Sequence, residues 1–208
     1  MFLHRLCLGF LILLLGGCAG WVAETRLIPV AERDLPGLQG TYESDDGASG
    51  LFSPAEDGLL FLSDASGNDP PAKVAYDMLR EEQPEELRWG ARALEDNEAA
   101  TPFRPDRSYL IEVPVEGDEG KVVYYYTIVR VEGSEPVGSF RQYTVLCSKA
   151  AEAFAARKED KLCIFDDYAR LRAAALDALA WYDDARMEVD VTTFNRQPEE
   201  AKTEPDGS

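Results

Sequence analysis

The chain has 208 residues, 39 of them acidic and 21 basic, and its net charge is −18. This length predicts one globular domain of ordinary size, and the negative charge excludes nucleic acid as a partner, because phosphate binding needs clustered Lys and Arg. The only histidine is His4, so a chain from which the first residues are removed can hold no Ser-His-Asp triad, Cys-His pair or histidine metal site.

Residues 1–17 have the layout of a secretory signal, in which a short positive start precedes an apolar run and small residues. The apolar run extends from Leu6 to Leu15. It has about ten residues, whereas a helix that spans a bilayer needs roughly 20. The segment is therefore predicted to be cleaved. The layout alone does not distinguish a lipoprotein signal from an ordinary signal peptide that happens to contain a cysteine.

The motif Leu15-Gly16-Gly17-Cys18 resembles the lipobox of bacterial lipoproteins, Leu-x-(Gly/Ala)-Cys. The resemblance implies cleavage between Gly17 and Cys18, diacylglycerol on the sulfur of Cys18, and a further acyl chain such as palmitate on its amine. Such chains hold a protein to a membrane, since each buried methylene contributes about 0.8 kcal/mol. Ala19 after the cysteine is similar to the outer-membrane class of Gram-negative lipoproteins, which predicts a position on the outer membrane facing the periplasm.

Two cysteines, Cys147 and Cys163, remain once Cys7 has left with the signal and Cys18 is lipidated. In an oxidising compartment they are expected to form a disulfide. The bond would close a loop of about 15 residues and contribute on the order of 3 kcal/mol. The alternative is a redox pair, but the Cys-x-x-Cys spacing typical of such pairs is missing.

The remaining chain divides by composition into three parts. Residues 18–36 are interpreted as a lipidated tether, in which the apolar residues at 27–30 could form a short edge strand beside Pro29. Residues 37–194 are predicted to form a single globular domain. Residues 195–208 have one alanine as their only apolar residue and are predicted to form a disordered tail.

Strands are predicted wherever apolar residues alternate between turn residues. The predicted strands cover residues 38–43, 58–62, 73–80, 109–115, 122–131, 139–147 and 187–194. The clearest signal is the hairpin around the turn at 117–120, and residues 73–80 would also fit a helix. Leu38-Gln39-Gly40-Thr41-Tyr42 is similar to the opening strand of small lipocalin-like barrels, but the predicted fold class does not depend on that one strand.

Two helices are predicted near the C-terminus. Residues 148–159 are rich in alanine, and residues 165–182 carry apolar side chains at helical spacing. Asp166, in the first turn of the second helix, is expected to cap it. The predicted fold class is therefore α+β, a mostly antiparallel β-sheet with the two helices packed on one face.

The acidic clusters do not predict a catalytic or metal site. The loop at 64–69 has oxygen-bearing side chains, but its glycine does not have the EF-hand position, so an ordinary turn is expected. Acidic doublets such as Asp166-Asp167 and Asp183-Asp184 are common in so acidic a chain. They are interpreted as solvated surface, although a glycosidase also needs two carboxylates.

The strongest candidate for a binding surface is the run Tyr124-Tyr125-Tyr126. In a strand, Tyr124 and Tyr126 lie on one face and Tyr125 on the other. If the face of Tyr124 and Tyr126 is exposed, its two adjacent rings form a binding surface. The alternative is a sheet buried on both faces, with a helix over the second face.

The expected function is a non-enzymatic accessory or binding module of the cell envelope. It would be attached to the membrane through lipid on Cys18 and would contact an envelope protein, with no catalytic residue, cofactor or metal. One alternative is a histidine-free hydrolase of envelope polymers that uses carboxylates. The other is a carrier that holds a hydrophobic ligand in a cavity enclosed by the sheet.

Overall fold

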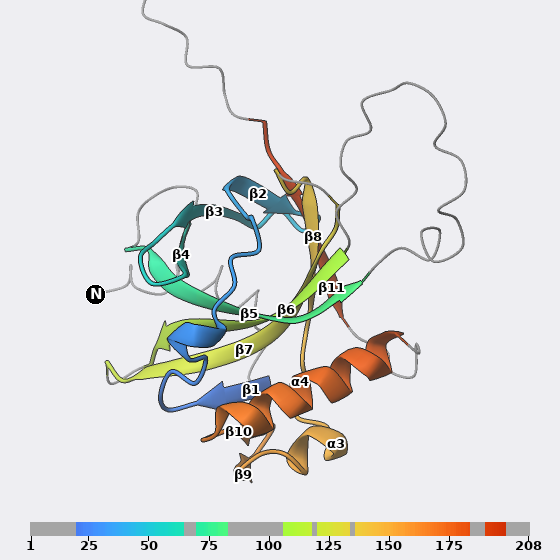
Figure 1. The fold of residues 1–208 in the computed structure, drawn as a ribbon. Coiled ribbons are helices and arrows are strands. Elements are labelled where there is room, and N and C mark those ends of the chain that lie inside the picture. The colour runs from blue at the N-terminus through green and yellow to red at the C-terminus, as the bar shows by residue number, and fades with distance from the viewer. Residues whose placement is uncertain are drawn as a thin grey trace, which may run out of the picture.

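A computed structural model describes residues 20–64, 70–82, 106–117, 120–133, 136–183 and 190–198. Within these ranges the chain forms one sheet of 11 strands, most of which closes on itself as a barrel (Figure 1). The two helices lie outside the barrel, at its lower end in Figure 1.

Eight antiparallel strands make the barrel. They are β2 (Gly40–Ser44), β3 (Ser49–Pro54), β4 (Leu59–Asp64), β5 (Ala72–Glu82), β6 (Asp106–Glu116), β7 (Val122–Val131), β8 (Ser139–Tyr143) and β11 (Val191–Arg196). Their order is β6-β5-β4-β3-β2-β11-β8-β7, and the pairing of β6 with β7 closes the ring. Closure pairs both edges of these strands and so removes the free edges at which sheets aggregate.

Three further strands extend the sheet below the barrel. They are β1 (Gly20–Ala23), β10 (Leu162–Ile164) and β9 (Arg157–Glu159). The long strand β7 makes this possible, because its residues 124–126 pair with β1 while its residues 128–131 pair with β8. Strand β1 in turn runs parallel to β10. The N-terminal strand β1 thus lies between β7 and β10, two strands that come much later in the sequence.

The prediction of a tether from residue 18 to residue 36 is wrong for the residues that the structure describes. All four residues of β1 are buried, and Ile28 belongs to the hydrophobic core. The expected edge strand at 27–30 is absent, and a short 3-10 helix, η1 (Val30–Glu32), follows instead. At the other end β11 continues to Arg196, two residues into the segment predicted as a tail.

The interior of the barrel is filled by large side chains from alternate positions of its strands. The rings of Phe140 and Phe194 stack with their centres 4.7 Å apart. The ring of Tyr42 packs edge-on against Phe140, and its hydroxyl donates to the carbonyl of Val137 at 2.8 Å. Such interdigitated aromatic residues leave little room for a ligand inside the barrel.

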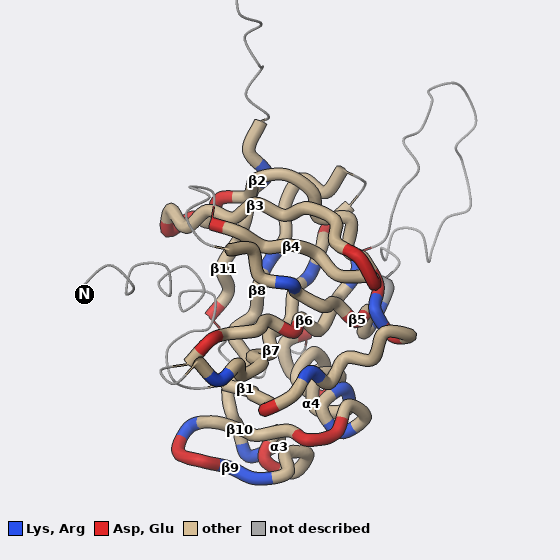
Figure 2. Tube along the Cα trace, turned by 90° about the vertical axis from the view of Figure 1, so that its left-hand side faces the viewer, with Lys and Arg blue, Asp and Glu red and all other residues tan. Residues whose placement is uncertain are grey.

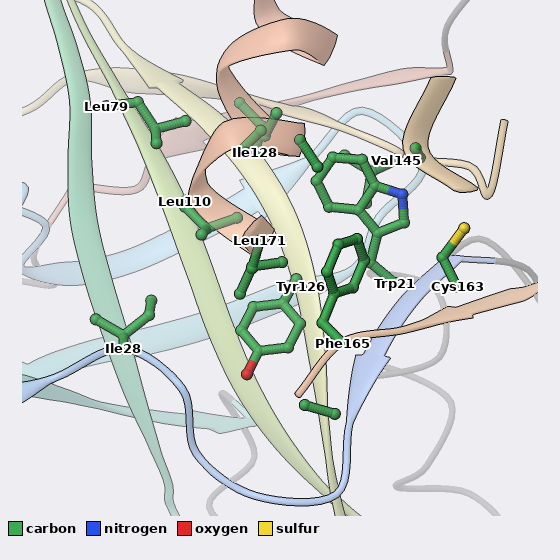
Figure 3. Packing of buried hydrophobic residues seen from close by; sticks show 14 of the residues in the cluster. Trp21, Ile28, Leu79, Leu110, Tyr126, Ile128, Val145, Cys163, Phe165 and Leu171 are labelled. Atoms are coloured by element: carbon green, nitrogen blue, oxygen red, sulfur yellow. The ribbon is translucent and has the colours of Figure 1, made fainter. Parts of the chain in front are cut away.

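A second core lies between the outer face of the barrel and helix α4 (Tyr168–Asp183). Leu171 is fully buried there and packs with Leu110 and Tyr126 (Figure 3). Strands β6 and β7 are therefore covered on both faces. The expected cap at Asp166 is wrong by one residue, because the carboxylate of Asp167 accepts the hydrogen bond from the Arg170 N–H.

The first predicted helix is shorter than expected. Helix α3 (Lys149–Glu152) begins where Ser148 accepts a hydrogen bond from the Ala151 N–H. From residue 157 the chain forms β9, although an Ala-rich helix was predicted up to 159. Strand β9 pairs with β10 through a turn that contains Asp160 at positive φ. Pairing within the fold thus overrides the helical propensity of the segment.

The prediction of a mostly antiparallel β structure is confirmed, whereas closure into a barrel was not predicted. Among the described residues there are two short helices, and so less helix than the α+β class implied. The disulfide between Cys147 and Cys163 is present. It joins the segment after β8 to β10, just ahead of α4.

Candidate functional site

Two buried carboxylates lie on the outer face of the barrel, beneath the N-terminal segment and α4. Glu112 in β6 is 0% exposed and Asp77 in β5 is 2% exposed. Glu112 pairs with Ala75 across the two strands and Asp77 pairs with Leu110, so the carboxylates are diagonal neighbours on one face of the sheet. Burying a charge without a partner costs much free energy, so the groups that surround each carboxylate show what the carboxylate does.

Glu112 binds the N-terminal segment mainly through hydrogen bonds to one carboxylate oxygen. Its Oε2 accepts hydrogen bonds from the backbone N–H groups of Leu27 (2.7 Å) and Ile28 (3.0 Å), and from the Tyr126 hydroxyl (3.0 Å). Its Oε1 lies 3.3 Å from Nε of Arg26. The carboxylate therefore takes the place of a neighbouring strand for residues 27 and 28. This explains why the expected edge strand does not form.

Asp77 connects helix α4 to the barrel in the same way. Its Oδ2 accepts from the Tyr168 hydroxyl at 2.9 Å and from Nε of Arg172 at 3.2 Å. The Arg172 guanidinium also donates to the carbonyl of Met78 at 3.3 Å. Both carboxylates are thus occupied in attaching outer segments to the barrel wall.

Burial shifts the pKa of both carboxyl groups in the same direction. It raises the pKa of Glu112 above its ordinary value, and the hydrogen bonds from Ile28 and Leu27 oppose that rise. Burial likewise raises the pKa of Asp77, against the effects of Tyr168 and Arg172. Raised carboxyl pKa values occur in general acids. None of the pockets described below, however, is lined by either residue.

The raised pKa of Glu112 predicts a pH-dependent contribution to stability. Between the ordinary value of 4.5 and the higher value in the fold, the folded chain binds more protons than the unfolded chain, so the free energy of unfolding falls as the pH rises. In Glu112→Gln this dependence is lost. Chemical denaturation should therefore show a larger stability advantage of the wild type over Glu112→Gln near pH 4 than near pH 7. An advantage that grows with pH would contradict the raised pKa.

The structure buries Tyr126 and half-buries Tyr124, the two tyrosines that were candidates for a binding surface. Tyr126 is 2% exposed and packs with residues of α4, so the alternative of a face buried under a helix holds at this position. In Figure 3 its hydroxyl points away from Trp21 and Phe165. Tyr124 is half-buried, and the Arg26 guanidinium lies 5.3 Å from the centre of its ring. The pair therefore packs beneath the N-terminal segment.

The described residues form cavities at three places that bear on ligand binding. The one inside the barrel has about 20 Å³, roughly the space of one water molecule. A polar cavity of about 490 Å³ is lined by Arg130, Arg141 and Asp183. Arg130 forms ion pairs with Asp106 and Asp183, and Arg141 with Glu132, so carboxylates already neutralise the charge that would attract an anion.

The third cavity is an open groove of about 210 Å³ between α3 and α4. Trp21, Leu146, Ala178 and Trp181 give it a mostly apolar lining, with Lys149 and Asp177 as its charged members. Leu146 is 42% exposed and Trp181 is 36% exposed. We name these lining residues the α3–α4 groove. Sequence periodicity could not reveal it, because its walls come from the start, the middle and the end of the chain.

The other predicted sites fall partly outside the described ranges. The cleavage site Gly17–Cys18 and most of the loop at 64–69 lie outside them. Within them, no group of three or more His, Cys, Asp or Glu side chains could hold a metal ion. No described helix is long and apolar enough to cross a bilayer.

Comparisons with protein-family models, with curated proteins and with solved structures find no match for this chain.

Proposed function

We propose that the chain is a lipid-anchored protein of the cell envelope whose barrel domain acts as a non-enzymatic binding module close to the membrane surface. The observation that carries the proposal is the position of β1. This buried strand begins at Gly20, two residues after the lipobox cysteine Cys18. Consecutive Cα atoms are 3.8 Å apart, so two residues of chain can span no more than about 8 Å. A lipid on Cys18 would hold the domain directly against the bilayer.

The filled barrel and the occupied carboxylates favour a binding module over the two alternatives. A carrier needs an enclosed cavity of several hundred Å³, whereas the barrel interior offers about 20 Å³. A hydrolase needs two acids that face a cleft, whereas Glu112 and Asp77 bind the N-terminal segment and α4. Within the part of the chain that the structure describes, the α3–α4 groove offers an apolar concavity for a ligand or partner. Ala19 supports placement on the outer membrane of a Gram-negative envelope.

Replacing the lipobox cysteine tests the anchor. Cys18→Ser is expected to move the protein from the membrane pellet to the soluble fraction, or to leave an uncleaved signal segment on it. The mass of the wild-type N-terminal peptide should show cleavage before Cys18 and added acyl groups. Cys7→Ser is the matched control, because Cys7 lies in the apolar run, and it should leave mass and location unchanged. A Cys18→Ser protein that is still cleaved normally and found in the pellet would overturn the proposal.

A further inference from the structure

The start of β1 lies beside the α3–α4 groove. The N–H of Gly20 donates to the carbonyl of Lys161 at 3.2 Å. The indole N–H of Trp21 donates to the carbonyl of Leu146 at 3.0 Å, and the side chains of both residues line the groove. The point where the chain enters the domain is therefore flanked by the β9–β10 turn on one side and by the groove on the other.

The charge of the segment that contains α3 and β9 differs from that of the whole chain. The segment from Lys149 to Lys161 carries four cationic and three anionic residues, although the whole chain has a net charge of −18. Arg157, Lys158 and Lys161 are exposed on the β9–β10 arm, where Figure 2 shows basic and acidic residues alternating at the lower end of the molecule. Arg157 is paired with Glu24 and Glu159, and Lys158 with Glu152. The segment is therefore close to neutral, which suits a phosphate-bearing lipid surface better than the acidic body does.

The side chains of the groove suit the boundary between headgroups and acyl chains. Trp181 and Leu146 are partly exposed although they are large and apolar. Tryptophan is enriched at membrane interfaces, since its ring is apolar and its N–H is polar. A volume of about 210 Å³ exceeds the roughly 150 Å³ of an apolar cavity that takes up benzene. It is large enough for part of one acyl chain.

From these observations we infer that the α3–α4 groove faces the bilayer and takes up part of an acyl chain of a membrane phospholipid, while the near-neutral β9–β10 arm lies at the level of the headgroups. The inference rests on the proposed anchor, because the lipid on Cys18 brings this end of the domain to the membrane. The anchor would hold the protein on the bilayer, and the groove would fix the orientation of the barrel above it. The opposite end of the barrel would then point away from the membrane, toward partners.

Quenching of tryptophan fluorescence by brominated lipid tests this orientation. The full-length lipidated protein, carrying Trp89→Phe to remove a tryptophan outside the described ranges, is reconstituted into phosphatidylcholine vesicles with or without bromine on the acyl chains. Trp181 emission is expected to be lost with brominated chains. The further substitution Trp181→Phe leaves Trp21 as the emitting tryptophan, so the contribution of Trp181 is obtained by difference. Flotation of the same vesicles measures anchoring separately.

Two matched variants give the test its control. Leu146→Glu places a charge in the groove and should abolish the quenching while flotation remains. Leu51→Glu changes a residue of similar exposure on the barrel strand β3 and should leave the quenching intact. Circular dichroism checks that both variants fold.

The outcomes separate the groove from the anchor. A wild-type protein that floats without quenching overturns the groove inference and leaves the anchor standing. Emission that is blue-shifted but not quenched would mean that the groove holds the chain's own acyl group or another apolar partner, which also overturns the inference. A protein without acyl groups on Cys18 overturns both proposals. Quenching that Leu146→Glu removes and Leu51→Glu preserves supports the inference.

Discussion

Replacing Glu112 by alanine is expected to lower the free energy of unfolding by about 3–5 kcal/mol, the range for removing one partner from a buried charged network. The substitution leaves the N–H groups of Leu27 and Ile28 and the Tyr126 hydroxyl without their acceptor. It also leaves the guanidinium of Arg26 without its ion pair. Chemical denaturation followed by far-ultraviolet circular dichroism measures the change. The N-terminal segment should also become more sensitive to proteases, since its attachment to β6 is lost.

Two further variants show whether the loss of unfolding free energy comes from the Glu112 carboxylate itself. Glu112→Gln keeps an acceptor oxygen and nearly the same shape, so it should cost less than Glu112→Ala. Glu43→Ala removes an exposed glutamate from barrel strand β2, and its effect should stay within about 0.5 kcal/mol. Equal losses for Glu112→Ala and Glu43→Ala would mean that the network does not support the fold.

Removing the disulfide is expected to lower the free energy of unfolding by about 3 kcal/mol, the chain-entropy value for a loop of roughly 15 residues. Cys147 and Cys163 are 16 residues apart in sequence, and the loop between them contains α3 and β9. Without the bond the unfolded chain gains conformational freedom. The segment after β8, which carries Leu146 of the α3–α4 groove, also loses its attachment to β10. Thermal and chemical denaturation of the double variant Cys147→Ala/Cys163→Ala measures this loss.

The same protein under reducing conditions provides the control. Wild type treated with a thiol reductant should unfold at the denaturant concentration of the double variant, and the variant itself should not respond to the reductant. If reduction leaves the wild-type transition unchanged, the bond does not contribute to stability.

The hairpin was predictable from sequence because its alternation is a local property. Val113 faces Tyr125 and Tyr109 faces Val129 in the register of β6 and β7, as the period-2 pattern and the glycine turn predicted. Closure of the barrel was not predictable. It depends on the pairing of β11 with both β2 and β8, and strands that are distant in sequence leave no trace in any single window of residues.

The candidate site was missed for a related reason. Glu112 and Asp77 each interrupt an apolar run in which both faces of the strand are hydrophobic, from 109 to 115 and from 74 to 79. That pattern indicates a strand buried on both sides with one charged residue within it. Such a residue requires a partner from elsewhere in the fold. The sequence could have revealed the buried charge, but not that Arg26 and the N–H groups of residues 27 and 28 would be its partners.

The position of β1 has a consequence for the order of folding. Trp21 emerges among the first residues of the chain, yet the carbonyl that its indole binds belongs to a residue 125 positions later, and its parallel partner strand β10 comes later still. Contacts of such sequence separation form slowly, because the loop must close before they can contribute. Strand β1 therefore stays unpaired until β7 and β10 have been made, well into the second half of the chain. For the proposed envelope lipoprotein, this delay would leave the first strand of the domain unpaired while the chain is exported.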